Sequence, residues 1–497
     1  MAGATSQILF VSSELYPLVK TGGLADVSYA LPHALQLSGA AVTLMIPGYP
    51  SVLSHLPHAK IVHRFTDPVF SAGGSLLEAR MPGSGERLLV FNSPQLYQRD
   101  GGIYVNEKQQ DWPDNALRYG QFDRAVAEVA INRCGLTWQP DVVHCNDWQT
   151  GLVPGLIKHL AGEAGQSAPA SVFTIHNLAY QGIFDRKAFD QLQLPARWWS
   201  IDGVEYYGRF SFLKAGLMFA DKMTTVSPRY REEVLTPDLG CGMEGVLHSR
   251  RDQLEGILNG VDYANWNPET DRLIAHQYSS DTLDDKRINK IALQRETGLP
   301  IDSSIPIVGL ISRLVSQKGI DLVIALLNRM NGRRVQWVIL GNGDEEFEAE
   351  LERLASMYSD KIYFNRSYDE GLAHQIEAGA DIFLMPSRYE PCGLNQLYSL
   401  RYGTLPLVRC TGGLADTVVN ATPETIADNS ATGFVFNTLD VSELESTLNH
   451  ALQLYTDQPV WRQISRRAMS RDFSWQRSAD KYLNVYMGVG GGGGGGG

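Results

Sequence analysis

The sequence Thr-Gly-Gly-Leu-Ala-Asp occurs twice, at residues 21–26 and 411–416, so that the two copies begin 390 residues apart. A glycine pair between a strand and a helix lets backbone N–H groups and the positive end of the helix approach an anion. Lys20 adds a full positive charge beside the first copy. This pattern favours phosphate binding and indicates two similar halves. The alternative is that the glycines only relieve crowding at ordinary strand-to-helix turns.

A second group of cations follows a predicted strand in the second half. Arg313 and Lys318 lie five residues apart, just before Gly319. A guanidinium fork and a compact ammonium at such a junction suit a diphosphate. The alternative is that both side chains form ordinary ion pairs, with Asp321 or Glu345 as partners.

Polar residues also follow three other predicted strands. Asp147 is expected either to bond a substrate hydroxyl or to cap the next helix. His176, followed by Asn177, is expected to donate to an oxygen on which charge develops, or else to be a structural histidine. Glu390 either caps a helix or contacts a polar ligand. Cys392 has the position of a thiol nucleophile, but no histidine partner is evident.

Short apolar runs alternate with amphipathic stretches and must position these residues. Runs that are apolar throughout indicate strands covered on both faces, so we expect a parallel sheet in each half. The predicted strands are 7–12, 41–46, 88–91, 141–144, 171–175, 222–226, 305–311, 335–340, 361–364, 381–385 and 405–408. The predicted helices are 24–37, 116–131, 319–329, 345–358, 394–402 and 466–487.

The chain is too long for one hydrophobic core, because its 497 residues exceed the usual size of a single domain. We expect two Rossmann-like, doubly wound α/β domains that face each other across a cleft. The polar, proline-containing stretch after residue 262 suggests a first domain at 1–256 and a second at 257–465. Residues 466–489 form a further helical segment, and 490–497 are a glycine tail.

Composition and missing motifs narrow the chemistry. A formal net charge of −12 argues against nucleic-acid and membrane partners. Five widely spaced cysteines without a Cys-x-x-Cys pair argue against disulfides and zinc, and the start of the chain lacks a signal segment, so we expect a cytoplasmic protein. The phosphate-binding motif Gly-x-x-x-x-Gly-Lys-Ser/Thr, His-Glu-x-x-His and Asp-x-Asp are all absent. We therefore expect no cofactor and no metal, and a diphosphate neutralised by basic side chains and helix ends.

Several motifs together resemble bacterial glycogen synthase and plant starch synthase, in order from about residue 7 to about residue 487. They are Lys-Thr-Gly-Gly-Leu-Ala-Asp-Val at 20–27, His-Asn-Leu-Ala-Tyr-Gln-Gly at 176–182, Gly-Met-Glu-Gly at 242–245, Leu-Asn-Gly-Val-Asp at 258–262, Ser-Arg-Leu at 312–314, Gln-Lys-Gly at 317–319 and Pro-Ser-Arg-Tyr-Glu-Pro-Cys-Gly-Leu at 386–394.

This resemblance implies a retaining, metal-independent glucosyltransferase of the GT-B fold. Its donor would be ADP-glucose, and its acceptor the non-reducing end of glycogen or another α-1,4-glucan. The resemblance also implies that the last helix crosses back to the first domain. A related transferase with another donor or acceptor, a noncatalytic glucan-binding protein and a phosphorylase-type enzyme are the alternatives.

The family pattern also implies roles for individual residues. Catalytic roles fall to Asp147, His176, Arg313, Lys318 and Glu390. Contacts with ADP-glucose fall to Lys20, Gly22, Gly23, Asp26, Asn177, Asn259, Arg313, Lys318, Glu390, Cys392, Gly393, Leu394 and Asn395.

The sequence departs from the family at two positions. Gln149 replaces a histidine of many bacterial members, and Asn395 replaces a threonine. At a third position the sequence agrees with glycogen synthases. Tyr398 is a tyrosine there too, whereas other related glycosyltransferases carry a second glutamate at this position. Retention of configuration is compatible with same-face attack by the acceptor hydroxyl, or with double displacement through Asp147 or Glu390.

Overall fold

The computed structural model describes residues 6–330, 332–367 and 369–490, and the chain divides into two compact units. Unit 1 runs to Gly260 and resumes at Trp475, and unit 2 is Val261–Ser474. The division therefore falls a few residues after the predicted boundary at 256/257. Residues 491–497 of the predicted glycine tail lie outside the described residues, and Gly490 is the last residue of a helix.

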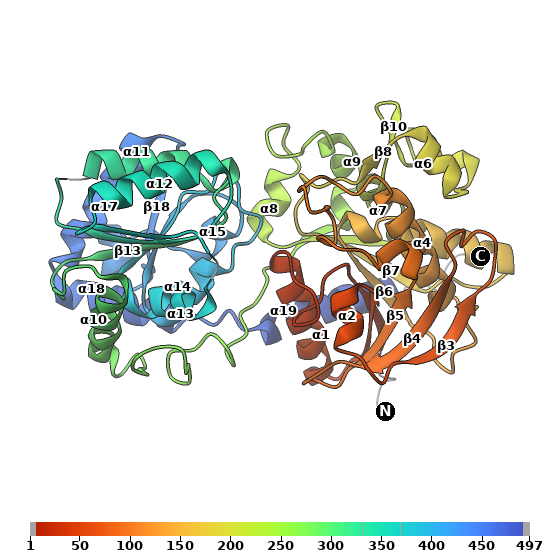
Figure 1. Cartoon of the computed structure of the whole chain (residues 1–497), viewed down its shortest axis with the longest axis horizontal. Coiled ribbons are helices and arrows are strands. Elements are labelled where there is room, and N and C mark those ends of the chain that lie inside the picture. Colours follow the sequence, from red (N-terminus) through yellow and green to blue (C-terminus); the bar gives the residue numbers. More distant parts are fainter. Residues whose placement is uncertain (1–5, 331, 368, 491–497) are drawn as a thin grey trace. The chain divides into compact units, whose positions relative to one another are not determined.

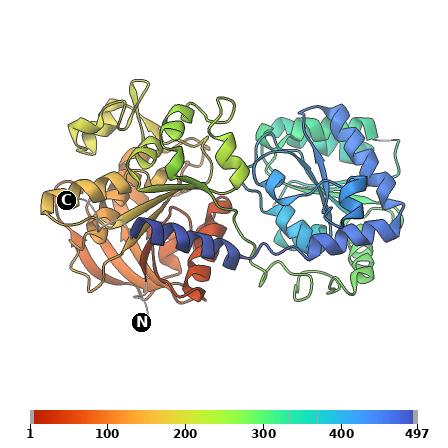
Figure 2. The same cartoon turned by 180° about the vertical axis from the view of Figure 1, so that it is seen from behind.

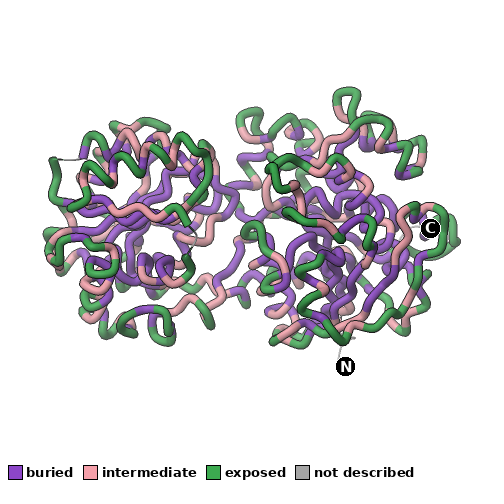
Figure 3. The backbone as a smooth tube through the Cα atoms, in the orientation of Figure 1, coloured by how far each residue is buried: buried purple, intermediate pink, exposed green. Residues whose placement is uncertain are grey.

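Unit 1 is built on a sheet that, within the described residues, has the strand order β12-β11-β7-β6-β1-β2-β5-β4-β3. Its strands are β1 (Gln7–Val11), β2 (Ala41–Pro47), β3 (Lys60–Phe65), β4 (Gly74–Arg80), β5 (Arg87–Asn92), β6 (Val142–Asn146), β7 (Ala170–Ile175), β11 (Lys222–Thr225) and β12 (Leu254–Gly256). A small antiparallel sheet consists of β8 (Ile183–Phe184), β10 (Arg209–Ser211) and β9 (Glu205–Tyr206). The large sheet forms the buried centre of the unit (Figure 3).

The sheet of unit 1 is mixed, so the expectation of a purely parallel sheet is wrong at one edge. The strands from β12 to β5 are parallel, whereas β4 pairs antiparallel with both β5 and β3. Neither β3 nor β4 was predicted. The edge strand β3 buries only its last residue fully, and such a strand lacks the apolar run that reveals a covered one.

Unit 1 also contains helices, among them the last helix of the chain. They are α1 (Gly23–Leu37), α2 (Pro50–Ser54), α3 (Pro94–Tyr97), α4 (Asn115–Ala130), α5 (Val153–Ala164), α6 (Arg186–Gln191), α7 (Phe212–Phe219), α8 (Pro228–Glu233), α9 (Glu244–Ser249) and α19 (Trp475–Gly490). The dark blue α19 lies beside the red α1 (Figure 2). Its Tyr486 hydroxyl lies 2.7 Å from Nδ1 of the buried His144 on β6, so the C-terminal helix is part of the core of unit 1.

The prediction of one helix over 466–487 is wrong, because the segment contains two helices. The first ends at Met469 and α19 begins at Trp475. Between them the Asp472 carboxylate accepts a bond from the Ser474 amide at 2.8 Å. Such a local side-chain bond offers the backbone an alternative to the helix.

Unit 2 has a parallel sheet in the order β15-β14-β13-β16-β17-β18. Its strands are β13 (Ile307–Ile311), β14 (Gln336–Leu340), β15 (Ile362–Asn365), β16 (Ile382–Met385), β17 (Leu405–Arg409) and β18 (Phe434–Phe436). Its helices are α10 (Lys286–Thr297), α11 (Ile320–Met330), α12 (Glu345–Met357), α13 (Glu370–Gly379), α14 (Asn395–Tyr402), α15 (Gly412–Thr417), α16 (Pro423–Ala427), α17 (Val441–Tyr455) and α18 (Gln458–Met469). Helices α11, α12 and α17 cover one face, and α10 and α13 the other (Figure 1).

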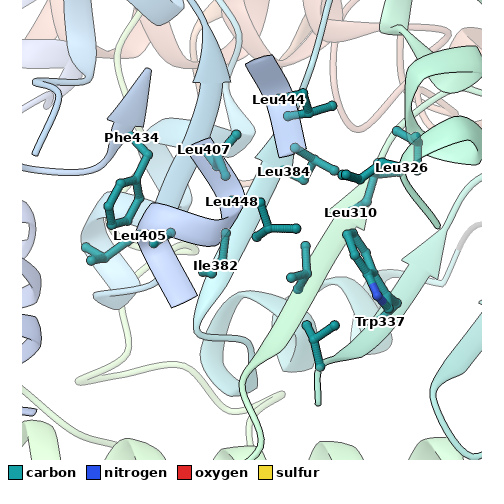
Figure 4. Close-up of a cluster of buried hydrophobic side chains, with 14 of the residues drawn as sticks. Leu310, Leu326, Trp337, Ile382, Leu384, Leu405, Leu407, Phe434, Leu444 and Leu448 are labelled. Carbon is teal, nitrogen blue, oxygen red and sulfur yellow. The ribbon is translucent and has the colours of Figure 1, made fainter. Parts of the chain in front are cut away.

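The core of unit 2 explains why its strands were recognised from sequence. Leu310, Trp337 and Ile382 come from three neighbouring strands and pack with Leu326 of α11 and Leu448 of α17, all of them almost fully buried (Figure 4). Burying such side chains contributes about 1.5–3 kcal/mol each, so the apolar runs are required by stability. Every predicted strand and helix overlaps an observed one. None of the described helices is both long and apolar enough to cross a membrane.

Candidate functional site

The candidate residues of unit 1 follow three adjacent strands. Strands β7, β6 and β1 are neighbours and parallel, so the loops after them leave the sheet at the same edge. Lys20 lies in the loop after β1, Asp147 directly follows β6, and His176 directly follows β7. Asn259 follows β12, which is separated from β7 by β11.

The first glycine pair begins α1. Gly22 is the N-cap residue with extended backbone angles, and Gly23 is the first helical residue. A methyl group added to Gly22 would meet no atom within 4 Å. The Lys20 ammonium lies 2.8 Å from Asp26 in the first helical turn, and both side chains are about one third or more exposed. These residues therefore form an open, solvent-accessible turn at a helix N-terminus.

A carboxylate that was not selected from sequence holds this turn. One oxygen of Glu14 accepts bonds from the amides of Thr21 at 2.7 Å and Gly22 at 2.9 Å. The other oxygen accepts the Tyr104 hydroxyl at 2.8 Å. Glu14 is buried, and this burial raises the pKa of its carboxyl group, although the three bonds act in the opposite direction.

Asp147 binds backbone amides of the neighbouring strand end. Its Oδ1 accepts bonds from the N–H groups of His176 at 2.7 Å and Asn177 at 3.4 Å. It does not cap the following 3₁₀ helix (Trp148–Thr150), so the capping alternative is wrong. Burial raises the pKa of Asp147 to about 7, and its backbone has a φ of 57°, which is uncommon for a residue other than glycine. A buried carboxylate in a strained backbone is typical of a functional site.

His176 has a defined tautomer. Its Nε2 lies 2.9 Å from Oδ1 of Asn146, whose amide nitrogen donates to the Val11 carbonyl at 3.0 Å. Because that bond fixes the Asn146 amide, Nε2 must be the donor and Nδ1 is left as an acceptor. Desolvation lowers the pKa of His176 to about 3, so the ring is neutral near pH 7. The expectation that His176 donates to a reacting oxygen is corrected, because its Nε2–H already donates to Oδ1 of Asn146.

Among the buried amide oxygens that lack a partner in the described residues, two belong to residues that the sequence analysis named. Asn259 Oδ1 and Gln149 Oε1 are both buried and make no hydrogen bond in the part of the chain that the structure describes. Unsatisfied buried acceptors are rare, and they favour a ligand or water at these positions. Asn177 differs, since its Oδ1 accepts the Ala179 amide at 3.1 Å.

In unit 2 the predicted cation and carboxylate meet. Strands β13 and β16 are adjacent, and the Lys318 ammonium lies 2.6 Å from the largely buried Glu390 carboxylate, which also accepts the Ser387 hydroxyl at 3.0 Å. Glu390 does not cap α14, whose N-cap residue is Leu394. The ion pair places a positive and a negative group together where the two strands end.

Arg313 is exposed and forms no ion pair with any described residue. Asp321, its proposed structural partner, contacts Arg388 instead. The alternative that Arg313 and Lys318 pair with Asp321 or Glu345 is therefore wrong. Arg313 presents a full positive charge that the surrounding protein does not use.

The residues around the start of α14 are held by their backbone conformation and by side-chain contacts. Gly393 has a φ of 73°, which favours glycine. The Leu394 side chain packs against the core, and the Asn395 amide donates to the Ile311 carbonyl at 2.9 Å. Cys392 is buried. The side chains of these residues hold the loop in place.

The second glycine pair packs against this same loop. A methyl group on Gly412 would lie 1.9 Å from the Glu390 carbonyl oxygen, and one on Gly413 would lie 2.1 Å from that of Cys392. The Gly413 amide already donates to the carbonyls of Glu390 and Pro391 at 3.2 Å. For the second copy, the crowding alternative explains the glycines.

Tyr398 stacks on Trp266 with ring centroids 4.1 Å apart and an interplanar angle of 3°. The ring is packed against the core of unit 2, so the position where other glycosyltransferases carry a glutamate has a packing role here.

Among the residues that the structure describes, no group of three or more His, Cys, Asp or Glu side chains is arranged to hold a metal ion.

Comparisons with known proteins identify the family of this chain. Residues 7–249 match the family described as starch synthase catalytic domain, and residues 296–468 match glycosyl transferases group 1. Glycogen synthase 2 of Nitrosococcus oceani is 48% identical over 97% of this chain and 96% of its own length. The chain belongs to the glycogen and starch synthase family. Glycogen synthase 1 of Methylococcus capsulatus is also 48% identical, again over 97% of this chain and 96% of its own length.

The solved structures agree with this family. The catalytic domain of starch synthase IV from Arabidopsis thaliana, bound to ADP and acarbose, superposes with a TM-score of 0.88 at 30% identity, covering 98% of this chain and all of that one. The chain is thus a glycosyltransferase of the GT-B fold, as predicted.

The residues that the sequence analysis missed are Glu14, Tyr104 and Asn146. Glu14 and Asn146 lie just after or at the end of strands β1 and β6, a signal that was used for Asp147 but not for them.

Proposed function

We propose that this family member elongates glycogen by transferring glucose from ADP-glucose to the non-reducing end of an α-1,4-glucan with retention of configuration. The observation that carries the proposal is the Lys318–Glu390 pair near Arg313, which has no ion-pair partner among the described residues, in a chain that matches glycogen synthases over nearly its whole length. The ADP and acarbose bound to the starch synthase IV domain support a nucleotide-sugar donor and a glucan acceptor. We also propose a cytoplasmic location, which free cysteines at all five positions support.

In the proposed reaction, basic groups stabilise the departing ADP. Arg313 and Lys318 neutralise the diphosphate, and Lys20 with the amides at the start of α1 supplies further positive potential. This charge stabilisation takes the place of a divalent ion. Gly393 and the first residues of α14 contribute helix-end amides on the same principle.

In this proposal the transferred glucose contacts polar groups that follow the strands. Glu390 and Asp147 accept bonds from its hydroxyls, and His176 accepts one at Nδ1. The unpaired Asn259 acceptor takes a further donor group of the substrate. Asp26 holds the Lys20 ammonium at 2.8 Å and so sets its position.

We propose same-face attack by the acceptor 4-hydroxyl as ADP leaves. Positive charge then builds at the anomeric carbon, where nearby carboxylates stabilise it. Double displacement would need Asp147 or Glu390 as a nucleophile, and both carboxylates already accept hydrogen bonds. Recovery of a glycosyl adduct on either residue by mass spectrometry would overturn the same-face mechanism.

A donor competition assay tests the function. Purified protein is given glycogen together with ADP-glucose and UDP-glucose, and the released nucleotides are separated. We expect ADP to accumulate in proportion to glucan growth. Accumulation of UDP instead would assign another donor, and glycogen binding without nucleotide release would assign a noncatalytic role.

Arg313→Ala tests the role of the cations. We expect kcat/KM for ADP-glucose to fall by about 10²–10³, the scale of lost transition-state electrostatics. The control is Arg366→Ala, another exposed arginine of unit 2, which contacts Glu352 at the surface. A loss below tenfold, or an equal loss in the control, would remove Arg313 from this role.

A further inference from the structure

Two backbone amides of the glycine turn in unit 1 are already occupied. The N–H groups of Thr21 and Gly22 both point at one oxygen of Glu14, at 2.7 and 2.9 Å. A phosphate approaching the turn therefore does not find these donors free. Within the described residues, the donors here that Glu14 does not hold are the Lys20 ammonium, which contacts Asp26 at 2.8 Å, and the amides of Gly23 and Leu24 at the start of α1. The next amide, that of Ala25, already donates to the Gly22 carbonyl at 3.3 Å.

Glu14 is itself held from several sides. The Tyr104 hydroxyl lies 2.8 Å from its second oxygen and 2.7 Å from the Ser13 hydroxyl. The Tyr104 carbonyl accepts the Asn115 side-chain amide at 2.9 Å. Because Asn115 is the first residue of α4, the carboxylate is connected to a helix of the unit's core.

The segment between Glu14 and the turn is also fixed by backbone hydrogen bonds. Leu15 and Val19 exchange two backbone bonds of 3.0 Å, which form an isolated bridge. The loop from Glu14 to Gly22 is thus tied at its base by this bridge and at its end by the carboxylate. Lys20 lies between the two ties, so its backbone position depends on both.

Within the described residues, no lysine, arginine or histidine forms an ion pair with Glu14. Its charge is balanced by two amides, a phenol and the positive end of α1. A buried carboxylate that costs desolvation energy and has no cation partner serves geometry rather than ion pairing. The glutamate is only 4% exposed, so it is not a surface group that meets the loop by chance.

We propose that Glu14 is a positioning residue for the donor site: its carboxylate fixes the Lys20–Gly23 turn so that the Lys20 ammonium and the α1 amides meet the diphosphate of the nucleotide sugar. The inference rests on the proposed function for the identity of that diphosphate. Glu14 acts through the geometry of its bonds. Its charge is not required.

Four variants of the full chain separate geometry from charge. Glu14→Gln keeps an oxygen for the two amides and an NH₂ group for the Tyr104 oxygen. Glu14→Asp keeps the charge but is one methylene too short to hold the turn. Glu14→Ala removes both the charge and the acceptor oxygens. Glu86→Ala is the matched control, since Glu86 is an equally buried carboxylate of unit 1 that contacts His33 at 3.0 Å.

We expect Glu14→Ala and Glu14→Asp each to raise KM for ADP-glucose about tenfold or more, because misplacing a binding group by about 1 Å has effects of this size. KM for glycogen should stay within about threefold, and Glu14→Gln and Glu86→Ala should stay within about threefold for both substrates. An unchanged KM in Glu14→Asp, or a Glu14→Gln variant as impaired as Glu14→Asp, overturns the proposal.

Amide hydrogen exchange gives a readout that does not depend on the reaction. We expect Thr21 and Gly22 to exchange faster in Glu14→Asp than in the wild type and to stay protected in Glu14→Gln. If the wild type shows no activity with ADP-glucose, the proposed function fails while this exchange pattern still tests Glu14. Equal exchange in all variants would contradict the positioning role.

Discussion

The two copies of Thr-Gly-Gly-Leu-Ala-Asp have the same residues and opposite roles. In the first, Gly22 stands in open space and the turn faces solvent. In the second, Gly412 and Gly413 are buried and lie against carbonyl oxygens of the Glu390–Cys392 loop, at distances where a methyl group has no room. The comparison shows that one glycine pair leaves backbone groups accessible, whereas the other lets two chain segments touch.

Three buried carboxylates of the two units differ in the groups that balance their charge. Asp147 and Glu14 in unit 1 are balanced by backbone amides, whereas Glu390 in unit 2 is balanced by the Lys318 ammonium. Partial charges compensate a buried carboxylate less fully than a whole charge does, in agreement with the raised pKa values of Asp147 and Glu14. Asp147 and Glu14 are therefore held by dipoles, and Glu390 by a counterion.

The largest expected effect concerns the dipole-held carboxylate Asp147. Burial raises the pKa of Asp147 from its ordinary value of 3.8 to about 7, so the folded state binds the extra proton. Stability should fall as the pH rises from about 4 to about 7 and then stay level. Asp147→Asn cannot ionise, and it should gain up to about 4 kcal/mol relative to the wild type across this range. Urea unfolding of both proteins at pH 4.5 and pH 8 measures the difference, and a pH-independent difference would contradict it.

The next effect distinguishes the two glycine pairs by packing. Gly413→Ala places a methyl group against the backbone of Cys392, which cannot move aside without shifting the loop. We expect a loss of about 3 kcal/mol in the free energy of unfolding. Gly22→Ala is the matched change in the first copy and should cost less than about 1 kcal/mol. Equal losses in the two variants would mean that the copies do not differ in the way described.

A smaller effect tests how α19 supports the strand that carries Asp147. Tyr486→Phe removes the hydroxyl 2.7 Å from Nδ1 of His144 and leaves a buried ring nitrogen unpaired. We expect the free energy of unfolding to fall by about 2 kcal/mol. Met487→Ala, at an exposed position of the same helix, serves as the control and should change it by less than about 0.5 kcal/mol. Thermal unfolding at a fixed pH measures both, and a silent Tyr486→Phe would show that the contact carries no stability.

The smallest effect concerns the ion pair beside the first glycine turn. Lys20 and Asp26 are 2.8 Å apart but substantially exposed. A double-mutant cycle with Lys20→Met and Asp26→Asn should give a coupling energy below about 0.5 kcal/mol. The same Lys20→Met variant should lose donor affinity, which would separate ligand binding from stability. A coupling above about 2 kcal/mol would indicate a structural pair.

Much of the fold was predictable, and the reason lies in particular segments. Gln336–Leu340 is buried throughout, and Ile307–Ile311 is buried except for its half-buried last residue, so their apolar runs identified them as covered parallel strands. Lys60–Phe65 is mostly exposed, and it went unpredicted because no apolar run marks it. The break at 470–474 was missed because the helical pattern on both sides is strong and the interruption depends on one local bond at Asp472.

The candidate site was predictable as a set of residues but not as a set of contacts. Lys318 and Glu390 were both selected, and their pairing with each other was not. His176 was selected as a donor, whereas its bond to Asn146 makes Nδ1 an acceptor. Glu14 was passed over, although it stands after the end of β1 as Asp147 does after β6.

The sequence by itself determined which chemical groups stand at the strand ends and, through the apolar runs, the two α/β domains whose sheets put them there. Only the tertiary structure decided what each group contacts. The physical reason is that a hydrogen bond links groups close in space regardless of chain distance: Glu14 meets Tyr104 across 90 residues and His144 meets Tyr486 across 342. The same reason gives identical glycine pairs different roles, because the atoms that surround a residue come from elsewhere in the chain.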